Sequence, residues 1–227
     1  MVTALGIWNS RAGQDWLLEK AATLAILQPG PITEFDGLQV FMCGTSSPLP
    51  DPNRAQACVA ILAGEELYIV DTGAGSARVA TLGRLPLERL EAVFLTHFHS
   101  DHIAALPEFN LNSWVAGRPA PLSVFGPPGV AEVVDGLNAA YRLDSTYRVA
   151  HHGDELMRPE LGVMQAELME AGTAQDFDDL TVTSFEVNHD PIRPAVAYRF
   201  DYRGRSVVVS GDAIVTQGPV SYTHLTL

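Results

Sequence analysis

The chain has 227 residues, which is enough for one sizeable hydrophobic core. Hydrophobic residues make up 47% and charged residues 18%, a balance that excludes an intrinsically disordered protein. Acidic residues outnumber basic ones 27 to 14, and the net charge of −13 argues against tight non-specific binding of nucleic acid. We therefore expect no DNA partner.

The first 36 residues predict a helix and a linker. Residues 14–28 have helical composition with an apolar face, and the Pro-Gly-Pro at 29–31 ends it. We interpret 1–36 as a packing segment without chemistry. The pattern contains neither a secretory signal nor a run of eighteen apolar residues, so the chain as written is expected to be cytoplasmic. A membrane-anchored or periplasmic location stays open if Met1 is not the natural start.

From Gly37 the pattern changes to strands. Apolar runs at 38–44, 57–64 and 66–73 predict three strands, the last two joined by a hairpin at Gly64. Cys43 and Cys58 lie in neighbouring strands. They could form a disulfide in an oxidising compartment, but we interpret them as buried free thiols, because two cysteines are too few for a disulfide scaffold.

Asp71 stands at the end of the third predicted strand, ahead of a helix predicted over 76–83. Two compatible roles suit a carboxylate there. It can satisfy backbone amides of the turn, and it can hydrogen-bond to metal-binding side chains and orient them.

The densest cluster of polar side chains is the sequence THFHSDH, residues 96–102. It follows a buried strand predicted over 90–95 and precedes the start of a helix. A tight strand-to-helix loop lets side chains converge on one point. Imidazole and carboxylate groups are ligands for zinc, iron or manganese, so the loop predicts a metal site. Its candidate ligands are His97, His99, Asp101 and His102.

Beyond this loop, a strand and turn at 121–130 lead into a further helix. Residues 141–162 are polar and aromatic, and we interpret them as an irregular loop that carries His151 and His152. This histidine pair is a candidate for substrate binding. The alternative is a solvent-facing pair with a local hydrogen-bonding role.

Two more metal-type side chains follow strands near the end of the chain. His189 comes after an alternating strand at 180–187, and Asp212 follows a hairpin formed by 194–202 and 205–210. Three separate strand ends thus carry groups that bind metal.

Taken together, these residues resemble the metallo-β-lactamase superfamily. The family motif HxHxDH is present in full, with a later histidine and a later aspartate in order, and the similarity covers roughly 38–213. The resemblance implies an α/β fold, a four-layer αβ/βα sandwich, here expected over 37–218 and incomplete at its C-terminus.

The resemblance also implies a ligand set for two divalent metal ions. His97, His99 and His189 would hold the first ion, Asp101 and His102 would contribute to the second, and Asp212 would bridge them. Zinc is the expected metal, with manganese or iron as alternatives. In this family a hydroxide lies between the metals. Asp101 would be the catalytic group that holds it.

Within the superfamily, residues 43–54 and the Val-Asp-Thr-Gly strand end resemble the ribonuclease Z and arylsulfatase-like branch. Ribonuclease Z enzymes carry a tRNA-gripping arm between the later histidine and the bridging aspartate. Here His189 and Asp212 are only 23 positions apart. We therefore expect a hydrolase of a small phosphodiester, sulfate ester or similar ester, with RNA disfavoured as partner and homodimerisation left open. The alternatives are a ribonuclease Z-like tRNA 3′-processing endonuclease and a non-catalytic metal-binding module.

The last nine residues, 219–227, resemble the translated read-through of a transposase sequencing adapter. We expect this tail not to be natural and do not assign His224 as a metal ligand. The family carries one more histidine after the bridging aspartate, so we expect the second metal site, and hydrolysis, to be impaired in this chain.

Overall fold

The computed structural model describes residues 10–11, 13–17, 20, 37–49 and 51–214. The chain divides into two compact units, 1–33 and 34–227. In the first, residues 11, 13–17 and 20 are helical. The rest of the predicted helix, the linker and the tail 219–227 with His224 lie outside the described residues, so these assignments stay predictions. No helix in the described part of the chain is long and apolar enough to cross a membrane.

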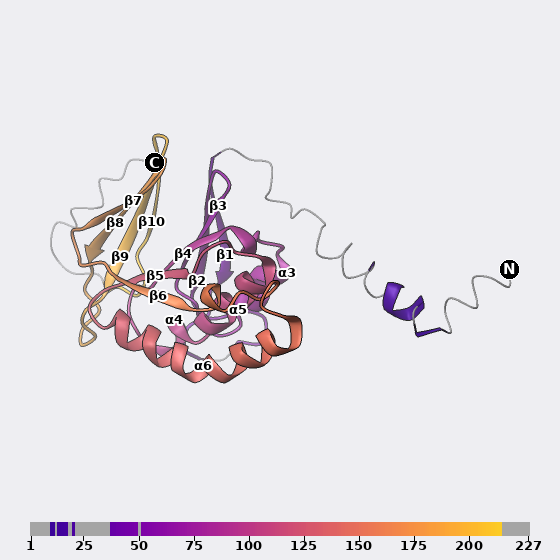
Figure 1. Cartoon of the computed structure of the whole chain (residues 1–227). Helices are drawn as coiled ribbons and strands as arrows, with labels where there is room; N and C mark the ends of the chain where they lie inside the picture. Colours follow the sequence, from indigo (N-terminus) through magenta and orange to yellow (C-terminus); the bar gives the residue numbers. More distant parts are fainter. Residues whose placement is uncertain (1–9, 12, 18–19, 21–36, 50, 215–227) are drawn as a thin grey trace. The chain divides into compact units, whose positions relative to one another are not determined.

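The first sheet of the larger unit has six strands in sequential order, β1 to β6 (Figure 1). The strands β1, β2 and β3 are antiparallel, and β3 to β6 are parallel. The β2–β3 hairpin turns at Gly64, whose φ of 61° suits a residue without a side chain. The strands are β1 Leu38–Gly44, β2 Cys58–Ala63, β3 Glu66–Val70, β4 Leu90–Phe94, β5 Leu122–Gly126 and β6 Met164–Leu168.

The second sheet has four antiparallel strands in the order β10-β9-β8-β7. The predicted strand at 180–187 and the hairpin that follows it are confirmed. The strands are β7 Ala174–Phe177, β8 Leu180–Glu186, β9 Val196–Tyr202 and β10 Arg205–Val209. Strands β6 and β7 were not predicted, because their residues are mostly exposed and the apolar alternation of a buried strand is absent.

The main core lies between the two sheets. Phe94 on β4 is its centre: its ring centroid lies 5.0 Å from that of Phe125 in the same sheet. It also lies 5.2 Å from Tyr198 and 5.3 Å from Phe200, both on β9 of the second sheet. Because aromatic side chains of both sheets share one buried cluster, the sheets pack face to face.

Helices lie on the outer side of the first sheet (Figure 1). Helix α3 contacts β1, and α6 contacts β5 and β6. The α/β sandwich predicted from the sequence is confirmed. The helices and 3₁₀ turns are α3 Ser76–Leu82, η1 Leu87–Arg89, α4 Ser100–Ile103, α5 Leu106–Ala116, α6 Val130–His152 and η2 Pro159–Leu161.

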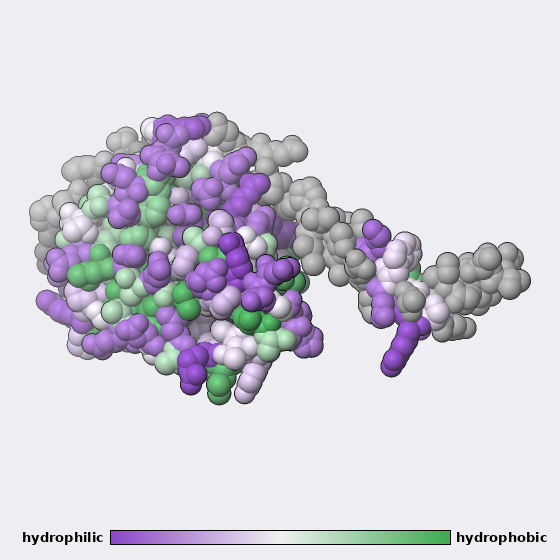
Figure 2. Space-filling view, in the orientation of Figure 1, coloured by the Kyte–Doolittle hydropathy of each residue, from purple (hydrophilic) through white to green (hydrophobic). Residues whose placement is uncertain are grey.

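The prediction of an irregular loop over 141–162 is wrong for its first half, which continues helix α6. Only Val130 and Val134 of this helix are buried, so its later turns lack the apolar periodicity that would indicate a helix. Hydrophobic and hydrophilic side chains are intermingled on the face shown in Figure 2. Within α6, Asp144 and Arg148 form an ion pair at 2.7 Å with the i,i+4 spacing that supports helices.

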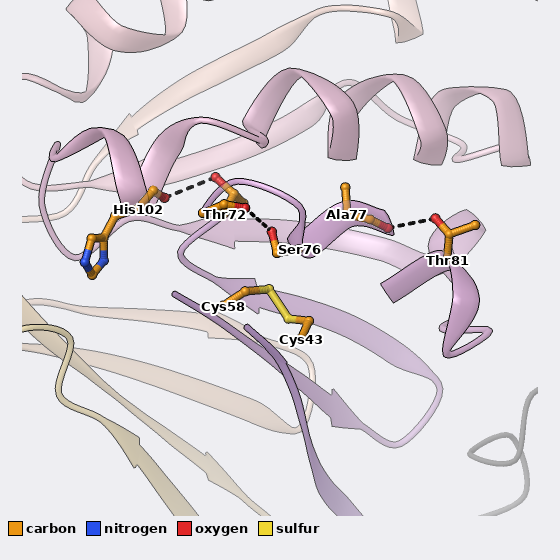
Figure 3. The surroundings of a disulfide bond; sticks show 8 residues. Cys43, Cys58, Thr72, Ser76, Ala77, Thr81 and His102 are labelled. Carbon is orange, nitrogen blue, oxygen red and sulfur yellow. Dashed lines mark hydrogen bonds between the residues drawn. A yellow bond between two sulfur atoms is a disulfide. The ribbon is translucent and has the colours of Figure 1, made fainter. Parts of the chain in front are cut away.

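The interpretation of Cys43 and Cys58 as free thiols is also wrong, because they form a disulfide (Figure 3). The β1–β2 register shifts between Met42 and Gly44, so Cys43 lies in a β-bulge opposite the start of β2. The two Cα atoms are 5.0 Å apart, which suits a disulfide. The sequence placed the cysteines on adjacent strands but contained no signal for the bulge that aligns them.

Candidate metal centre

The THFHSDH segment forms the predicted connection from β4 to a helix. His99 has extended backbone angles (φ −61°, ψ 147°) and precedes α4, a single turn that contains Asp101 and His102. This change from extended to helical backbone turns both side chains inward, and Asp101 and His102 are 5% and 1% exposed. His97, just after the strand, is fully buried.

His97, His99 and His189 converge on one point, with candidate ligand atoms within 4.8 Å of one another. The Nε2 atom of His97 lies 3.0 Å from Nδ1 of His99. Nε2 of His189 is buried and has no hydrogen-bond partner among the described residues. A buried nitrogen without a partner is costly, and a cation at this point would satisfy it. The three imidazoles therefore fit a metal ion.

A second group lies beside the first and consists of His97, His102 and Asp212. Nε2 of His102 lies 3.5 Å from Oδ1 of Asp212 and 3.6 Å from Oδ2 of Asp101. The other oxygen of Asp212 lies 3.8 Å from Nε2 of His189. Asp212 thus faces the first group with one oxygen and the second with the other, which is the arrangement expected of a bridging carboxylate.

A neutral imidazole has only one unprotonated nitrogen whose lone pair can bind a metal, so His97 would serve one cation only. Its short distance to His99 assigns it to the first group. Asp101, His102 and Asp212 then remain for the second. The ligand division implied by the family resemblance fits this geometry.

Asp71 lies behind the site and is 3% exposed. Its Oδ2 atom lies 2.8 Å from Nδ1 of His102, and its Oδ1 accepts a hydrogen bond of 2.9 Å from the backbone N–H of Thr96. The carboxylate therefore hydrogen-bonds to the metal loop and not to the turn that follows β3, and its role in orienting metal ligands stays a prediction. When Nδ1 of His102 donates to Asp71, the lone pair of Nε2 faces Asp101 and Asp212.

Thr96 extends this network to His97, a role that the sequence did not reveal. Its hydroxyl lies 2.8 Å from Oδ2 of Asp71 and 3.1 Å from Nδ1 of His97. If the hydroxyl donates to the carboxylate, Nδ1–H of His97 donates to the hydroxyl, and Nε2 keeps its lone pair for a metal. Asp71 thereby orients one imidazole directly and another through Thr96. The only signal in the sequence for this role of Thr96 was its place at the start of THFHSDH.

The electrostatics of the two buried imidazoles differ. Burial, together with the neighbouring His102 and His99, lowers the pKa of His97 to about 3, so this ring is neutral at physiological pH. Burial also disfavours the charged form of His102. The hydrogen bond and charge of Asp71, together with the charges of Asp212 and Asp101, outweigh that effect and raise the pKa of His102.

His151 and His152 lie at the C-terminal end of α6, and both are exposed. Their ring centroids are 4.6 Å apart, and neither belongs to the two ligand groups. Substrate binding by this pair stays a prediction.

Gly73 allows the backbone to pass closely behind the metal loop. A Cβ atom on this residue would lie 2.2 Å from the carbonyl oxygen of Asp101 and 2.6 Å from the backbone of Gln56. We expect Gly73→Ala to lower the free energy of unfolding by about 3 kcal/mol, because backbone must move on both sides. Chemical denaturation measures this. Gly136→Ala is the control: nothing lies within 4 Å of its Cβ, and stability should stay equal or rise.

The sequence profile of the Metallo-beta-lactamase superfamily matches residues 51–224. The chain belongs to this superfamily. Curated relatives of this chain include a protein named ribonuclease Z from Mycobacterium bovis (strain BCG / Pasteur 1173P2). It is 40% identical over 180 residues, which are 78% of this chain and 63% of the relative. A ribonuclease Z from Mycobacterium marinum is 38% identical with the same coverage. The chain thus spans less than two thirds of these relatives.

Solved structures agree with the superfamily fold. The metallo-β-lactamase fold protein YhfI from Bacillus subtilis superposes with a TM-score of 0.58 at 20% identity, covering 81% of this chain and 65% of that one. The short form of human tRNase Z also superposes with a TM-score of 0.58, at 19% identity, covering 76% and 68%.

The sequence-based expectation of a small ester substrate, with RNA disfavoured, is wrong. The mycobacterial relatives are named ribonuclease Z. The expectation used net charge and the short interval between His189 and Asp212. Net charge is a sum over the chain and does not describe the potential at one site, where bound cations are the largest local charges.

Proposed function

We propose that this chain carries the metal centre of a ribonuclease Z-type endoribonuclease, which hydrolyses a phosphodiester bond of RNA. One observation carries the proposal. Asp212 faces both ligand groups, with one oxygen 3.5 Å from His102 and the other 3.8 Å from His189, in a chain 40% identical to a ribonuclease Z. A precursor tRNA with a 3′ extension is the substrate class that this assignment predicts.

Two divalent cations, zinc foremost, would supply Lewis acidity toward phosphoryl oxygens and lower the pKa of water. His97, His99 and His189 would hold one cation, and Asp101 and His102 the other, with Asp212 shared. Asp71 and Thr96 keep the imidazoles of His102 and His97 in the tautomer whose Nε2 lone pair faces the site. The site is partly open on the Asp212 side, where that side chain is 43% exposed.

Asp101 is the group we assign to hold the attacking water. Its carboxylate is buried and next to the second ligand group, and in the ionised state it accepts hydrogen bonds only. It would therefore orient a water molecule and accept a proton from it at Oδ1 or Oδ2.

Removal of metal should abolish cleavage. We expect protein dialysed against a chelator to cleave a precursor tRNA transcript with a 3′ extension at least about 10³-fold more slowly, because metal catalysis contributes several kcal/mol to the barrier. Added Zn²⁺ or Mn²⁺ should restore it. Product length on a denaturing gel measures the rate.

The control substrate is the mature tRNA without the extension, which should remain intact. Cleavage that persists at full rate after metal analysis shows no bound ion would overturn the metal-dependent assignment. Because the second metal site is expected to be impaired in this chain, cleavage should be slow but measurable with protein in excess over transcript. Metal-loaded protein in such excess that leaves every extended transcript intact would overturn the ribonuclease assignment.

A further inference from the structure

The Cys43–Cys58 disulfide lies behind the metal loop, and a continuous set of backbone contacts joins the two. Figure 3 shows the disulfide below the segment of Thr72 and Ser76, with His102 to the left and hydrogen-bonded to Thr72. Both cysteines are 1% exposed. The metal assignment of the proposed function makes no use of this bond.

The first contacts run from the disulfide to the segment after β3. Cys58 follows Gln56 and Ala57 directly in the chain. The N–H of Gln56 donates to the carbonyl of Ala74 at 3.1 Å, and the N–H of Gly73 donates to the carbonyl of Ala57 at 2.8 Å. At the other cysteine, the glycine that follows Cys43 permits equally close packing. A Cβ on Gly44 would lie 1.6 Å from the carbonyl oxygen of Gln56.

The next contacts run from this segment to the metal loop. The N–H of Thr72 donates to the carbonyl of His102 at 2.7 Å, and its hydroxyl donates to the same oxygen at 3.2 Å. The N–H of Ala105 donates to the carbonyl of Thr72, also at 2.7 Å. Gly73 packs against the carbonyl of Asp101. Movement of residues 56–57 would therefore shift the backbone that places Asp101 and His102.

We propose that the Cys43–Cys58 disulfide positions the Asp101–His102 half of the metal centre, so that its reduction weakens metal binding there. This inference rests on the metal centre assigned above. The disulfide connects the residues on either side of the 44–57 segment and so holds the ends of this loop together. The middle of the loop is largely exposed. Reduction by a dithiol replaces the S–S bond with two thiols, while the dithiol is oxidised to its own disulfide.

Hydrogen exchange on the metal-free wild type tests the connection directly. With dithiothreitol as reductant, we expect the amides of Gln56, Thr72, Gly73 and Ala105 to exchange at least about tenfold faster than in the oxidised protein. The amides of β8 and β9 in the second sheet should be unchanged. Equal exchange in both redox states, or a uniform loss of protection across both sheets, would overturn the proposal.

Zinc affinity of the double variant Cys43→Ala/Cys58→Ala tests the consequence for the site without adding thiols that bind metal. We expect competition with a chromophoric chelator to show zinc binding about tenfold weaker than in oxidised wild type, the effect typical of lost support around a ligand. The control, Val182→Ala, creates a cavity in β8 away from these contacts and should change the affinity less than twofold.

The results separate this inference from the proposed function. Equal zinc affinity of wild type and double variant, or an equal loss in Val182→Ala, would overturn the inference alone. No zinc binding by oxidised wild type would overturn the metal centre itself. If the double variant does not fold, the hydrogen exchange of oxidised and reduced wild type decides whether the disulfide positions the metal loop.

Discussion

Asp212→Asn is expected to slow cleavage of a 3′-extended precursor tRNA by about 10³-fold, because loss of metal-based charge stabilisation costs several kcal/mol. The substitution keeps the shape of the side chain but leaves one acceptor oxygen, and the other position becomes an NH₂ donor. In the wild type, one oxygen of Asp212 lies 3.5 Å from Nε2 of His102 and the other lies 3.8 Å from Nε2 of His189. The single oxygen of the asparagine can serve only one of these two ligand groups. Single-turnover rates and metal content per chain measure the effect.

Asp190→Asn is the matched control for this substitution. Asp190 is also an exposed aspartate beyond the end of a strand, β8, as Asp212 is beyond β10, but its carboxylate pairs with Arg193 at 2.8 Å on the surface. We expect cleavage and metal content to match the wild type. Both variants should keep their stability within about 0.5 kcal/mol, as is usual for exposed positions. Full activity of Asp212→Asn with two ions bound would contradict the bridging role.

Asp71→Asn is expected to weaken metal binding by about 10- to 100-fold without touching a ligand. If the amide oxygen keeps the hydrogen bond from Thr96 N–H, the NH₂ group stands where Oδ2 was, 2.8 Å from Nδ1 of His102. It must donate to that nitrogen. His102 then carries its proton on Nε2, and the lone pair that faced Asp101 and Asp212 is lost.

The same variant should lose about 2–3 kcal/mol of unfolding free energy, since hydrogen bonds to a buried charge are replaced by weaker ones. Asp71→Ala should lose more, because φ of 58° is unfavourable for alanine but tolerated by asparagine and aspartate. Nitrogen chemical shifts of the His102 ring report its tautomer. Asp201→Asn, at a more exposed carboxylate on β9, is the control. An unchanged tautomer and metal affinity in Asp71→Asn would contradict the orienting role.

Much of the fold follows from local patterns in the sequence. The strands around the core alternate or run apolar, as in β2, β4 and β8, and these were predicted to within a few residues. Elements with few buried side chains were not. The later turns of α6 and the strands β6 and β7 lack an apolar stripe, and tertiary contacts and internal hydrogen bonds determine their conformation.

The candidate ligands could be predicted because ligand chemistry depends on residue type. The three histidines and the one aspartate of THFHSDH are close in space on any tight loop, whatever the fold. Thr96 was missed as an orienting group, since nothing in its own position shows that its hydroxyl lies between Asp71 and His97. The bulge that aligns Cys43 with Cys58 was missed for the same reason.

By itself, the sequence determined which chemical groups are present, that they follow strand ends, and that the chain resembles the metallo-β-lactamase superfamily. Only the tertiary structure decided that His189 and Asp212 meet the loop, although both are far from it along the chain. An oxygen of Asp212 lies 3.5 Å from Nε2 of His102, and the ring centroid of His189 lies 4.8 Å from that of His97 and 5.5 Å from that of His99. The tertiary structure also decided the pairing of the cysteines and the inward orientation of Asp71. The physical reason is that convergence depends on sheet register and packing between sheets, and these arise from long-range contacts that no local pattern encodes.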